Sequence, residues 1–506
     1  MATTAENLAD PKLLQTEWDL EPLVYGEGEA GVDRLLSETT ERASAFAERY
    51  AGKLEKIESA ELERAMLELA EIQDMLGRAA SYAGLLFSTD TADPARGALL
   101  QRTQERATEI ETKLLFFDLE WAALDDARAE ELLADEGLEF CRHHLRSARR
   151  YRPHLLTEPE EKILSEKSIS SESAWGRLFG ELVSALRVEL DGDQIPLEVA
   201  LSRLQAPDRE ERRAAAVAVT HTLEPGLRTR AFIYNTLIYD KAVEDRLRSY
   251  PHWLASRNLA NEASDESVLA LIEAVRGRYD IPQRWYRLKA KLLGIPKVTD
   301  YDRMAPVSRE DVTYSFSDAR ALVLDTYQSF APEAGRITRR FFDERWIDAP
   351  VRPNKRGGAF CSYTVPSVHP YVLLNFTARQ RDVLTMAHEL GHGLHAALAQ
   401  PQGVFQFTTP LTLAETASVF GEALVFGRLL DQAADDQARL GLLAERIDGA
   451  VATVFRQIAN ELRAQYLLQY YSNSNAPNGK YLTIKVTSPT HPDLRIRARQ
   501  GYYAKK

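Results

Sequence analysis

Cysteine is scarce in this sequence: its 506 residues include only Cys141 and Cys361. Two cysteines are too few for a disulfide framework, and they are typical of a protein in a reducing cytosol. The chain also has no apolar run of about 18 residues, so we expect no membrane-spanning helix. Met1–Leu20 has neither a basic segment nor an apolar core, so we expect no secretory signal. Together these features predict a cytoplasmic protein.

Positive charge is also in deficit, with 63 Lys and Arg against 75 Asp and Glu and a formal net charge of −12. A chain this acidic is a poor ligand for nucleic acid or an anionic membrane, so we predict neither as a partner. The composition, 44% hydrophobic and 27% charged, is that of an ordinary globular protein. The length allows about two to four domains, and the sequence leaves the oligomeric state open.

Strand signals are few, and the fold class that the sequence predicts is mainly α. From about residue 32 to residue 188, apolar residues recur at spacings of three and four among Glu, Ala, Arg and Leu, which indicates packed helices. Asp191-Gly192, between two short apolar segments, predicts a hairpin. A second β region is expected at Gly358–Phe376. Within it Tyr371–Phe376 reads YVLLNF and leads directly into a helix that a capping box at Thr377–Gln380 opens.

The C-terminal end differs in charge and in periodicity from the rest of the chain. Residues 472–506 contain seven Lys or Arg and one acid, Asp493, so they carry +6 and the first 471 residues carry −12 − 6 = −18. Apolar and polar residues alternate around Leu482 and around Leu494, and Asn478-Gly479 is a hairpin-type turn. We therefore expect a small β-rich tail over residues 461–506.

The strongest chemical signal is His388-Glu389-Leu390-Gly391-His392, an H-E-x-x-H motif. Two histidines four residues apart lie on one face of a helix, where their imidazoles can bind one zinc ion. Glu389 can then take a proton from a water whose pKa the metal lowers, without binding the metal itself. The alternative interpretation is a pair of ordinary surface histidines, and Gly391 argues against it because a helix former there would favour stability.

A catalytic zinc site needs a third protein ligand, and Glu415 is the better candidate. It follows Thr409-Pro410, a plausible helix start, whereas His395 lies a further turn along from His392 and is expected to be a second-shell or surface residue. Glu422 lies seven residues after Glu415 on the same face, where it could hold the other ring nitrogen of a ligating histidine. The opposing interpretation of Glu422 is a surface glutamate. We expect one Zn²⁺ per chain.

This constellation resembles the oligoendopeptidase F branch of the thimet-oligopeptidase family of zinc metallopeptidases. The resemblance covers roughly residues 14–458. It is carried by Thr16–Leu20 (TEWDL), Tyr286–Ile295 (YRLKAKLLGI), Tyr301-Asp302, Ala305-Pro306, Gly357–Cys361 (GGAFC), Tyr371–Phe376, and His388–His392 followed after 22 residues by Glu415 in LAETASVFGE. The resemblance places His388, His392 and Glu415 at the zinc-ligand positions and Glu389 at the general base.

The resemblance also implies a fold and a class of substrate. It implies a two-lobed helical zinc metallopeptidase with a deep channel, which hydrolyses short unstructured oligopeptides and excludes folded proteins. Tyr371–Phe376 is similar to the family's edge strand, so we expect Tyr371, Leu373 and Asn375 to contact the substrate backbone. The expected divisions are an N-terminal helical region at 1–110, an oligoendopeptidase F-type helical domain at 111–195, a truncated catalytic domain at 196–460, and the tail.

The resemblance stops after Ile458-Ala459, where the family continues with a His- and Tyr-rich stretch that stabilises the oxyanion. The only later histidine is His491, and Glu461–Tyr503 is instead similar to the end of von Willebrand factor A-like bacterial proteins. Losing one oxyanion donor costs on the order of 10²–10³ in kcat. A second hypothesis is therefore a truncated or fused relative that binds zinc and peptide with weak or no turnover, and a third is an unstable fusion without a settled function.

Overall fold

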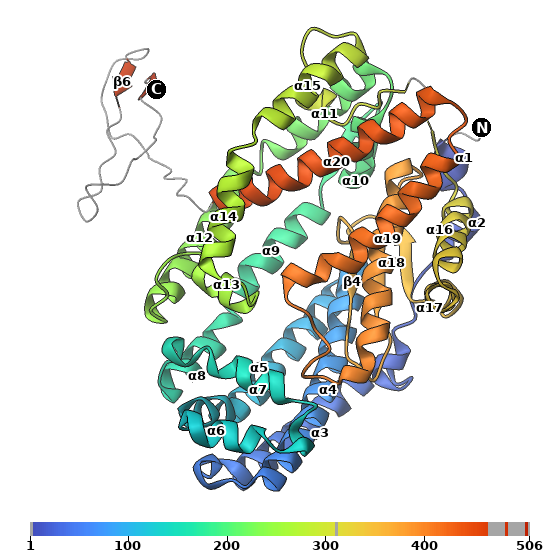
Figure 1. The fold of residues 1–506 in the computed structure, drawn as a ribbon. Coiled ribbons are helices and arrows are strands. Elements are labelled where there is room, and N and C mark those ends of the chain that lie inside the picture. The colour runs from blue at the N-terminus through green and yellow to red at the C-terminus, as the bar shows by residue number, and fades with distance from the viewer. Residues whose placement is uncertain (1–3, 309–311, 464–480, 484–500, 504–506) are drawn as a thin grey trace. The chain divides into compact units, whose positions relative to one another are not determined.

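Helices make up most of the computed structural model, which describes residues 4–308, 312–463, 481–483 and 501–503 (Figure 1). The α-helices are α1 (Thr4–Leu8), α2 (Pro11–Leu14), α3 (Gly28–Tyr50), α4 (Ser59–Thr89), α5 (Pro94–Ala123), α6 (Asp126–Leu133), α7 (Arg142–Arg149), α8 (Glu158–Ser168), α9 (Glu172–Ser184), α10 (Leu197–Ser202), α11 (Arg209–Leu223), α12 (Leu227–Leu247), α13 (Ala255–Ala260), α14 (Asp265–Arg276), α15 (Asp280–Leu293), α16 (Phe316–Phe330), α17 (Pro332–Asp343), α18 (Gln380–Ala399), α19 (Leu411–Asp431) and α20 (Asp436–Arg463).

The strands are short and form three small sheets. They are β1 (Arg187–Leu190), β2 (Asp193–Pro196), β3 (Ile347–Pro350), β4 (Phe360–Ser362), β5 (Tyr371–Phe376), β6 (Tyr481–Thr483) and β7 (Gly501–Tyr503). The mainly α fold class that the sequence predicts is therefore confirmed. No helix among the described residues combines the length and apolar character needed to cross a bilayer.

The long amphipathic helices of the N-terminal region pack on one another, as their periodicity predicts. Leu35 and Phe46 of α3, Ile72 of α4 and Ile110 of α5 are almost completely buried in one core. In α4 the apolar residues Leu69, Ile72, Leu76 and Ala79 are buried, whereas Leu67 is 49% exposed. Burying such stripes is the main source of stability for helices of this kind.

The predicted hairpin forms at β1 and β2, which pair antiparallel. Asp191 and Gly192 connect them with φ of 57° and 89°. Positive φ at both central residues defines the type I′ turn, which suits the twist of a two-residue hairpin. Here the local sequence is enough to determine the element.

The three-stranded sheet beside α18 corrects one expectation. Its order is β3-β5-β4, with β5 parallel to β3 and antiparallel to β4. The prediction that Tyr371–Phe376 is an edge strand is wrong, because the backbone of β5 is paired on both sides. The reason for assigning substrate contacts to Tyr371, Leu373 and Asn375 is lost with it. Tyr371 and Leu373 are in addition completely buried.

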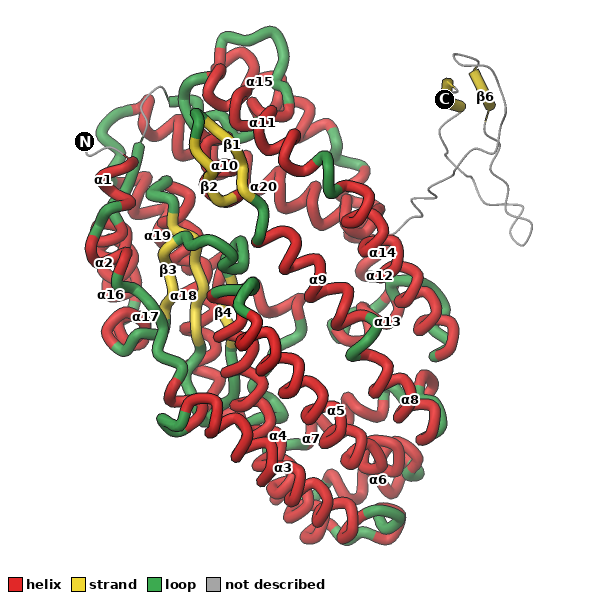
Figure 2. Tube along the Cα trace, turned by 180° about the vertical axis from the view of Figure 1, so that it is seen from behind, coloured by secondary structure: helices red, strands yellow, loops and turns green. Residues whose placement is uncertain are grey.

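The two edges of this sheet differ in whether another segment covers them. The β3 edge meets the N-terminal segment, where the Ala349 N–H donates to the Thr16 carbonyl over 3.1 Å. β4 pairs only with β5 among the described residues. Figure 2 shows the sheet from the side opposite α18, with the helix behind it. The available edge next to α18 therefore belongs to β4.

The start of α18 is capped two residues later than the sequence suggested. Arg379 is the residue before the helix, so the third helical position is Asp382 rather than Gln380. The Asp382 carboxylate accepts hydrogen bonds from the backbone N–H groups of Thr377 and Arg379 at 2.8 and 2.9 Å. Such a cap satisfies donors that the first helical turn leaves unpaired.

Helices α18 and α19 approach each other closely because two glycines lie between them. A Cβ at Gly391 would lie 2.5 Å from the Ala417 carbonyl oxygen, and a Cβ at Gly421 would lie 3.0 Å from the Ala387 carbonyl oxygen. The Tyr327 hydroxyl of α16 also enters this contact, donating to the Ala387 carbonyl over 2.8 Å. The glycine inside the H-E-x-x-H motif is thus required by backbone packing.

The chain divides into two compact units, Met1–Arg456 and Gln457–Lys506. In the second unit β6 and β7 pair antiparallel, with Tyr481 opposite Tyr503. This agrees with the β character expected of the tail. The proposed turn at Asn478-Gly479 lies outside the described residues. The finer division of the first 460 residues stays a prediction, as does the two-lobed arrangement with a deep channel.

We predict that Gly391→Ala lowers the free energy of unfolding by about 1–3 kcal/mol, the usual cost of forcing an extra methyl group into a packed interface. The neighbouring atoms are backbone and cannot rotate away. The change would be measured as a lower midpoint of urea or thermal unfolding.

The matched control is Gly427→Ala in the partner helix α19, where an added Cβ meets nothing within 4 Å. In a helix interior that substitution should be stabilising by up to ~1 kcal/mol. Equal midpoints for the two variants would contradict the packing role of Gly391.

Candidate active site

Three side chains from α18 and α19 converge on one point. The metal-binding atoms of His388, His392 and Glu415 all lie within 4.8 Å of one another. Glu415 Oε2 is 3.2 Å from His388 Nε2 and 3.6 Å from His392 Nε2. The imidazole rings stand at 82° to each other with centroids 5.0 Å apart. Residues 23 and 27 positions apart in sequence are thus brought together at one site.

The spacing of these atoms fits a tetrahedral ion. Two ligands held at ~2.0–2.1 Å from one tetrahedral centre lie about 3.4 Å apart. The two imidazole–carboxylate separations, 3.2 and 3.6 Å, bracket that value. The chemistry fits as well, since two imidazoles and a carboxylate form a common ligand set of catalytic zinc. Among the described residues, this is the cluster of His, Cys, Asp and Glu that could hold a metal ion.

Each of the three residues has a partner that orients it. His388 Nδ1 lies 3.3 Å from Glu422 Oε2, so a proton on Nδ1 leaves the Nε2 lone pair directed at the cluster. The buried Ser418 hydroxyl donates to Glu415 Oε2 over 2.8 Å. His392 makes a hydrogen bond to the backbone of Ala414. The sequence analysis anticipated the position of Glu422 but missed Ser418.

The carboxyl group of Glu389 lies in a more enclosed environment than Glu415. Glu389 is 6% exposed, whereas the Glu415 side chain is 61% exposed. Burial raises the pKa of Glu389 to about 7, opposed by the charge of His388 and reinforced by that of Glu415. A carboxyl group poised near neutral pH can both accept and release a proton, which suits a general base.

The pKa values of His388 and Glu422 are also shifted, in opposite directions. Burial lowers the pKa of His388, but the Glu422 hydrogen bond and the nearby carboxylates more than offset it and raise that pKa overall. Burial raises the pKa of Glu422, and the hydrogen bonds and charges of His388 and Arg446 outweigh it, so this pKa is lowered. Glu422 is therefore a carboxylate, the form that accepts the His388 N–H.

Two residues of the β4 segment face this site and were not singled out from sequence. Cys361 lies close enough to Glu389 for the carboxylate to act on its thiol, whose pKa burial raises well above the ordinary value. Tyr363 follows directly after the last residue of β4, and burial raises the pKa of its phenol, which the nearby charges of Cys361 and Glu415 raise further. Its hydroxyl is 3.5 Å from His395 Nδ1, and its ring contacts Phe407. The alternation after GGAFC was the signal that could have identified Tyr363.

The structure places His395 beside Tyr363 rather than in the cluster. His395 lies three residues after His392, and its charge acts on that imidazole. This is compatible with the expectation of a residue outside the metal ligands, but its role stays a prediction. Tyr470 and Tyr471, which the tail offers as further candidates for the oxyanion donor, lie outside the described residues.

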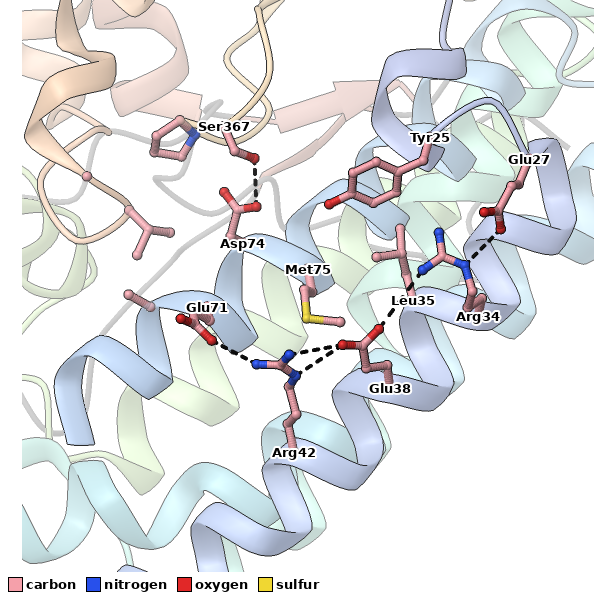
Figure 3. A pocket seen from close by; sticks show the side chains of 14 residues that line it. Tyr25, Glu27, Arg34, Leu35, Glu38, Arg42, Glu71, Asp74, Met75 and Ser367 are labelled. Atoms are coloured by element: carbon pink, nitrogen blue, oxygen red, sulfur yellow. Dashed lines mark hydrogen bonds and ion pairs between the residues drawn. The ribbon is translucent and has the colours of Figure 1, made fainter. Parts of the chain in front are cut away.

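A groove beside α3 and α4 is a feature separate from this cluster. It has a volume of about 890 Å³ and lies between α3, α4 and the segments at 366–367 and 403–404 (Figure 3). Arg42 pairs there with Glu38 and Glu71, and Ser367 donates to Asp74. None of the cluster residues lines this groove, so its size does not identify the site.

Comparison with known proteins identifies peptidase families. The sequence model of peptidase family M3 matches residues 202–483, and that of oligopeptidase F matches residues 120–187. The match of the first model thus extends past Ala459 into the tail.

Individual relatives are similar over most of the chain. Group B oligopeptidase PepB of Streptococcus agalactiae is 25% identical, covering 87% of this chain and 74% of its own. Oligopeptidase PepF of Bacillus subtilis is 24% identical, with 88% and 67% covered. Oligoendopeptidase-F from Enterococcus faecium has a similar fold, with a TM-score of 0.59 and 20% identity over 85% of this chain and 73% of its own.

The M3 match spans more than half of the residues, and a cluster fit to hold a metal lies inside it. This chain therefore belongs to peptidase family M3 and is a metallo-oligopeptidase related to oligoendopeptidase F.

Proposed function

We propose that this protein is a zinc-dependent endopeptidase that hydrolyses short, unstructured oligopeptides. The observation that carries the proposal is the convergence of His388, His392 and Glu415 within 4.8 Å, with Glu389 beside them. These three residues would hold one zinc ion per chain. When bound, zinc supplies a Lewis acid that polarises a carbonyl group and lowers the pKa of water to about 7.

One side chain of the site carries out the proton transfers, and two others hold the metal ligands in place. Glu389 accepts the proton of the attacking water and delivers it to the amine that leaves, so the same carboxyl group acts first as base and then as acid. Its enclosed position supports this role, because burial has already raised its pKa to about 7. Glu422 and Ser418 keep the ligating atoms of His388 and Glu415 in place.

For the substrate backbone we propose the free edge of β4 instead of β5. β4 pairs only with β5 among the described residues and carries Cys361, which faces Glu389. An extended peptide added to this edge would run past the cluster and be held through its main chain. Such binding accepts many sequences but requires an unfolded segment, which accounts for a preference for oligopeptides.

Tyr363 is our candidate for the group that stabilises the oxyanion. It comes from the end of β4, and burial raises the pKa of its phenol to about 12, so the hydroxyl keeps its proton at neutral pH. A protonated phenol can donate a hydrogen bond to the carbonyl oxygen as negative charge develops there. Glu415 also acts on this phenol, which supports its proximity to the cluster.

The rival function is zinc and peptide binding with weak turnover. The chain spans about three-quarters of the length of PepB. A wetter site would weaken the electrostatic stabilisation of an oxyanion. Cytoplasmic localisation likewise stays a prediction from the sequence.

We predict about one bound zinc per chain after dialysis, with a marked loss in His388→Ala and in Glu415→Ala. Each substitution removes one of three protein ligands. The measurement is elemental analysis of folded protein. Equal zinc in the parent and both variants would remove the basis of the metal centre.

Glu389→Gln should retain zinc but lower kcat/KM by at least about 10²-fold, since it removes proton transfer and leaves the ligands intact. Turnover would be followed with a quenched fluorescent peptide of about ten residues, and a folded protein of similar composition serves as the control substrate. Equal cleavage of peptide and folded protein would contradict a requirement for unstructured substrates. Robust cleavage by the parent would exclude the rival binding function.

Tyr363→Phe should reduce kcat about 10- to 100-fold with little change in KM or zinc content, because it removes a single donor to the oxyanion. A phosphinic peptide that mimics the tetrahedral state should lose affinity in parallel, which makes the test independent of turnover. Tyr314→Phe, on the segment before α16, is the matched control. Unchanged affinity for the phosphinic peptide in Tyr363→Phe would exclude the assignment.

A further inference from the structure

One turn of α20 connects the candidate site to a distant helix. In Figure 1, α20 runs between α15 and the pair α18 and α19. Within this turn, Glu445 accepts a hydrogen bond from Gln380 at the start of α18, and Arg446 forms an ion pair with Glu422 of α19. Asp448 faces the opposite way, towards α15. These contacts, all within residues 445–448, tie α20 to both sides.

The contact with α15 is a buried ion pair reinforced by hydrogen bonds. Asp448 accepts from Trp285 Nε1 over 2.7 Å and from Lys289 Nζ over 2.5 Å. Lys289 is completely buried and also donates to the Arg303 carbonyl over 2.5 Å. Separating a buried ion pair leaves an uncompensated charge and is strongly unfavourable. The position of α20 is therefore determined by α15, through a cluster that includes Ala444 and Val451.

The contact with α19 reaches the metal ligands in two steps. The Arg446 guanidinium carbon lies over the Phe426 ring, 5.6 Å from its centroid, and the guanidinium pairs with Glu422 Oε1. The other oxygen of the same carboxylate, Oε2, lies 3.3 Å from His388 Nδ1. A carboxylate bridging a guanidinium and an imidazole cannot rotate without breaking one of these bonds. Arg446 therefore limits the orientations available to Glu422, and through it to His388.

We propose that Arg446 is a positioning residue for the metal centre. It holds the Glu422 carboxylate against His388 and makes the affinity for zinc depend on where α20 lies. This inference rests on the proposed metal centre and extends it to a residue that acts on the metal-binding side chains through Glu422. A merely structural ion pair, with both side chains partly exposed, would contribute up to ~1 kcal/mol to folding and nothing specific to zinc.

The test measures the dissociation constant for zinc by competition with a chromogenic chelator. Arg446→Gln should raise this constant about tenfold, within the 10–100-fold range typical of groups that support a metal ligand. Arg446→Lys, which keeps the charge but not the fork of donors, should fall between the parent and Arg446→Gln. The matched control is Arg428→Gln, because Arg428 pairs with Asp325 and not with Glu422.

A double-mutant cycle separates the proposed route from a general loss of stability. In the Glu422→Gln background, adding Arg446→Gln should change the zinc constant by less than about twofold, since the bridging carboxylate is already absent. The visible absorption of the cobalt-substituted protein should change in Arg446→Gln and remain as in the parent in Arg428→Gln. Unfolding midpoints show whether each variant is folded, and Arg446→Lys continues the test if Arg446→Gln is not.

The outcomes distinguish this inference from the proposed metal centre. If His388→Ala loses zinc but Arg446→Gln binds it like Arg428→Gln, the role of Arg446 is wrong and the metal centre stands. Additive effects of Arg446→Gln and Glu422→Gln would also overturn it. If zinc is not bound through His388, His392 and Glu415 at all, both proposals fail together.

Discussion

The close contact between α18 and α19 is the constraint on which the candidate site depends. Gly391 and Gly421 allow the two backbones to approach to a distance at which a Cβ would overlap its neighbours. At that separation the Glu415 carboxylate reaches both imidazoles of the other helix, at 3.2 and 3.6 Å. The same glycine that weakens the helix as an isolated segment is therefore necessary for assembling the site. Catalytic geometry here depends on backbone packing before it depends on any charged group.

The site is also organised electrostatically. Glu389 and Glu422 lie near the histidines, and their neighbours shift the pKa values of the two carboxyl groups in opposite directions. Glu422 lies between His388 and Arg446 and is kept ionised. For Glu389, burial outweighs the opposing charge of His388, and its pKa rises to about 7. Two glutamates near one imidazole thus acquire opposite properties. One is suited to holding a ligand in place and the other to exchanging a proton.

The sheet beside α18 shows how pairing can redirect a functional interpretation. The apolar run YVLLNF is a strand with the predicted limits, yet its place in the middle of the sheet comes from β3, a segment with Asp and Pro that has no strand pattern of its own. Because β3 covers one side and β4 the other, the edge next to the cluster is moved to Phe360–Ser362. Cys361 and Tyr363 thereby become the residues that face the site.

The sequence by itself determined the elements whose signals are local. The 3.6-residue periodicity of the N-terminal helices, the Asp191-Gly192 hairpin and the pairing of His388 with His392 across one helical turn all depend on neighbours within a few residues. The spacing to Glu415 was informative only through resemblance to a family. The tertiary structure alone decided the order of the sheet, the role of Gly391 as a contact between helices, and the link from Arg446 to Glu422, 24 positions apart in sequence. These features arise from contacts between distant segments, and a single sequence carries no local pattern that encodes which of its many charged or apolar residues will meet.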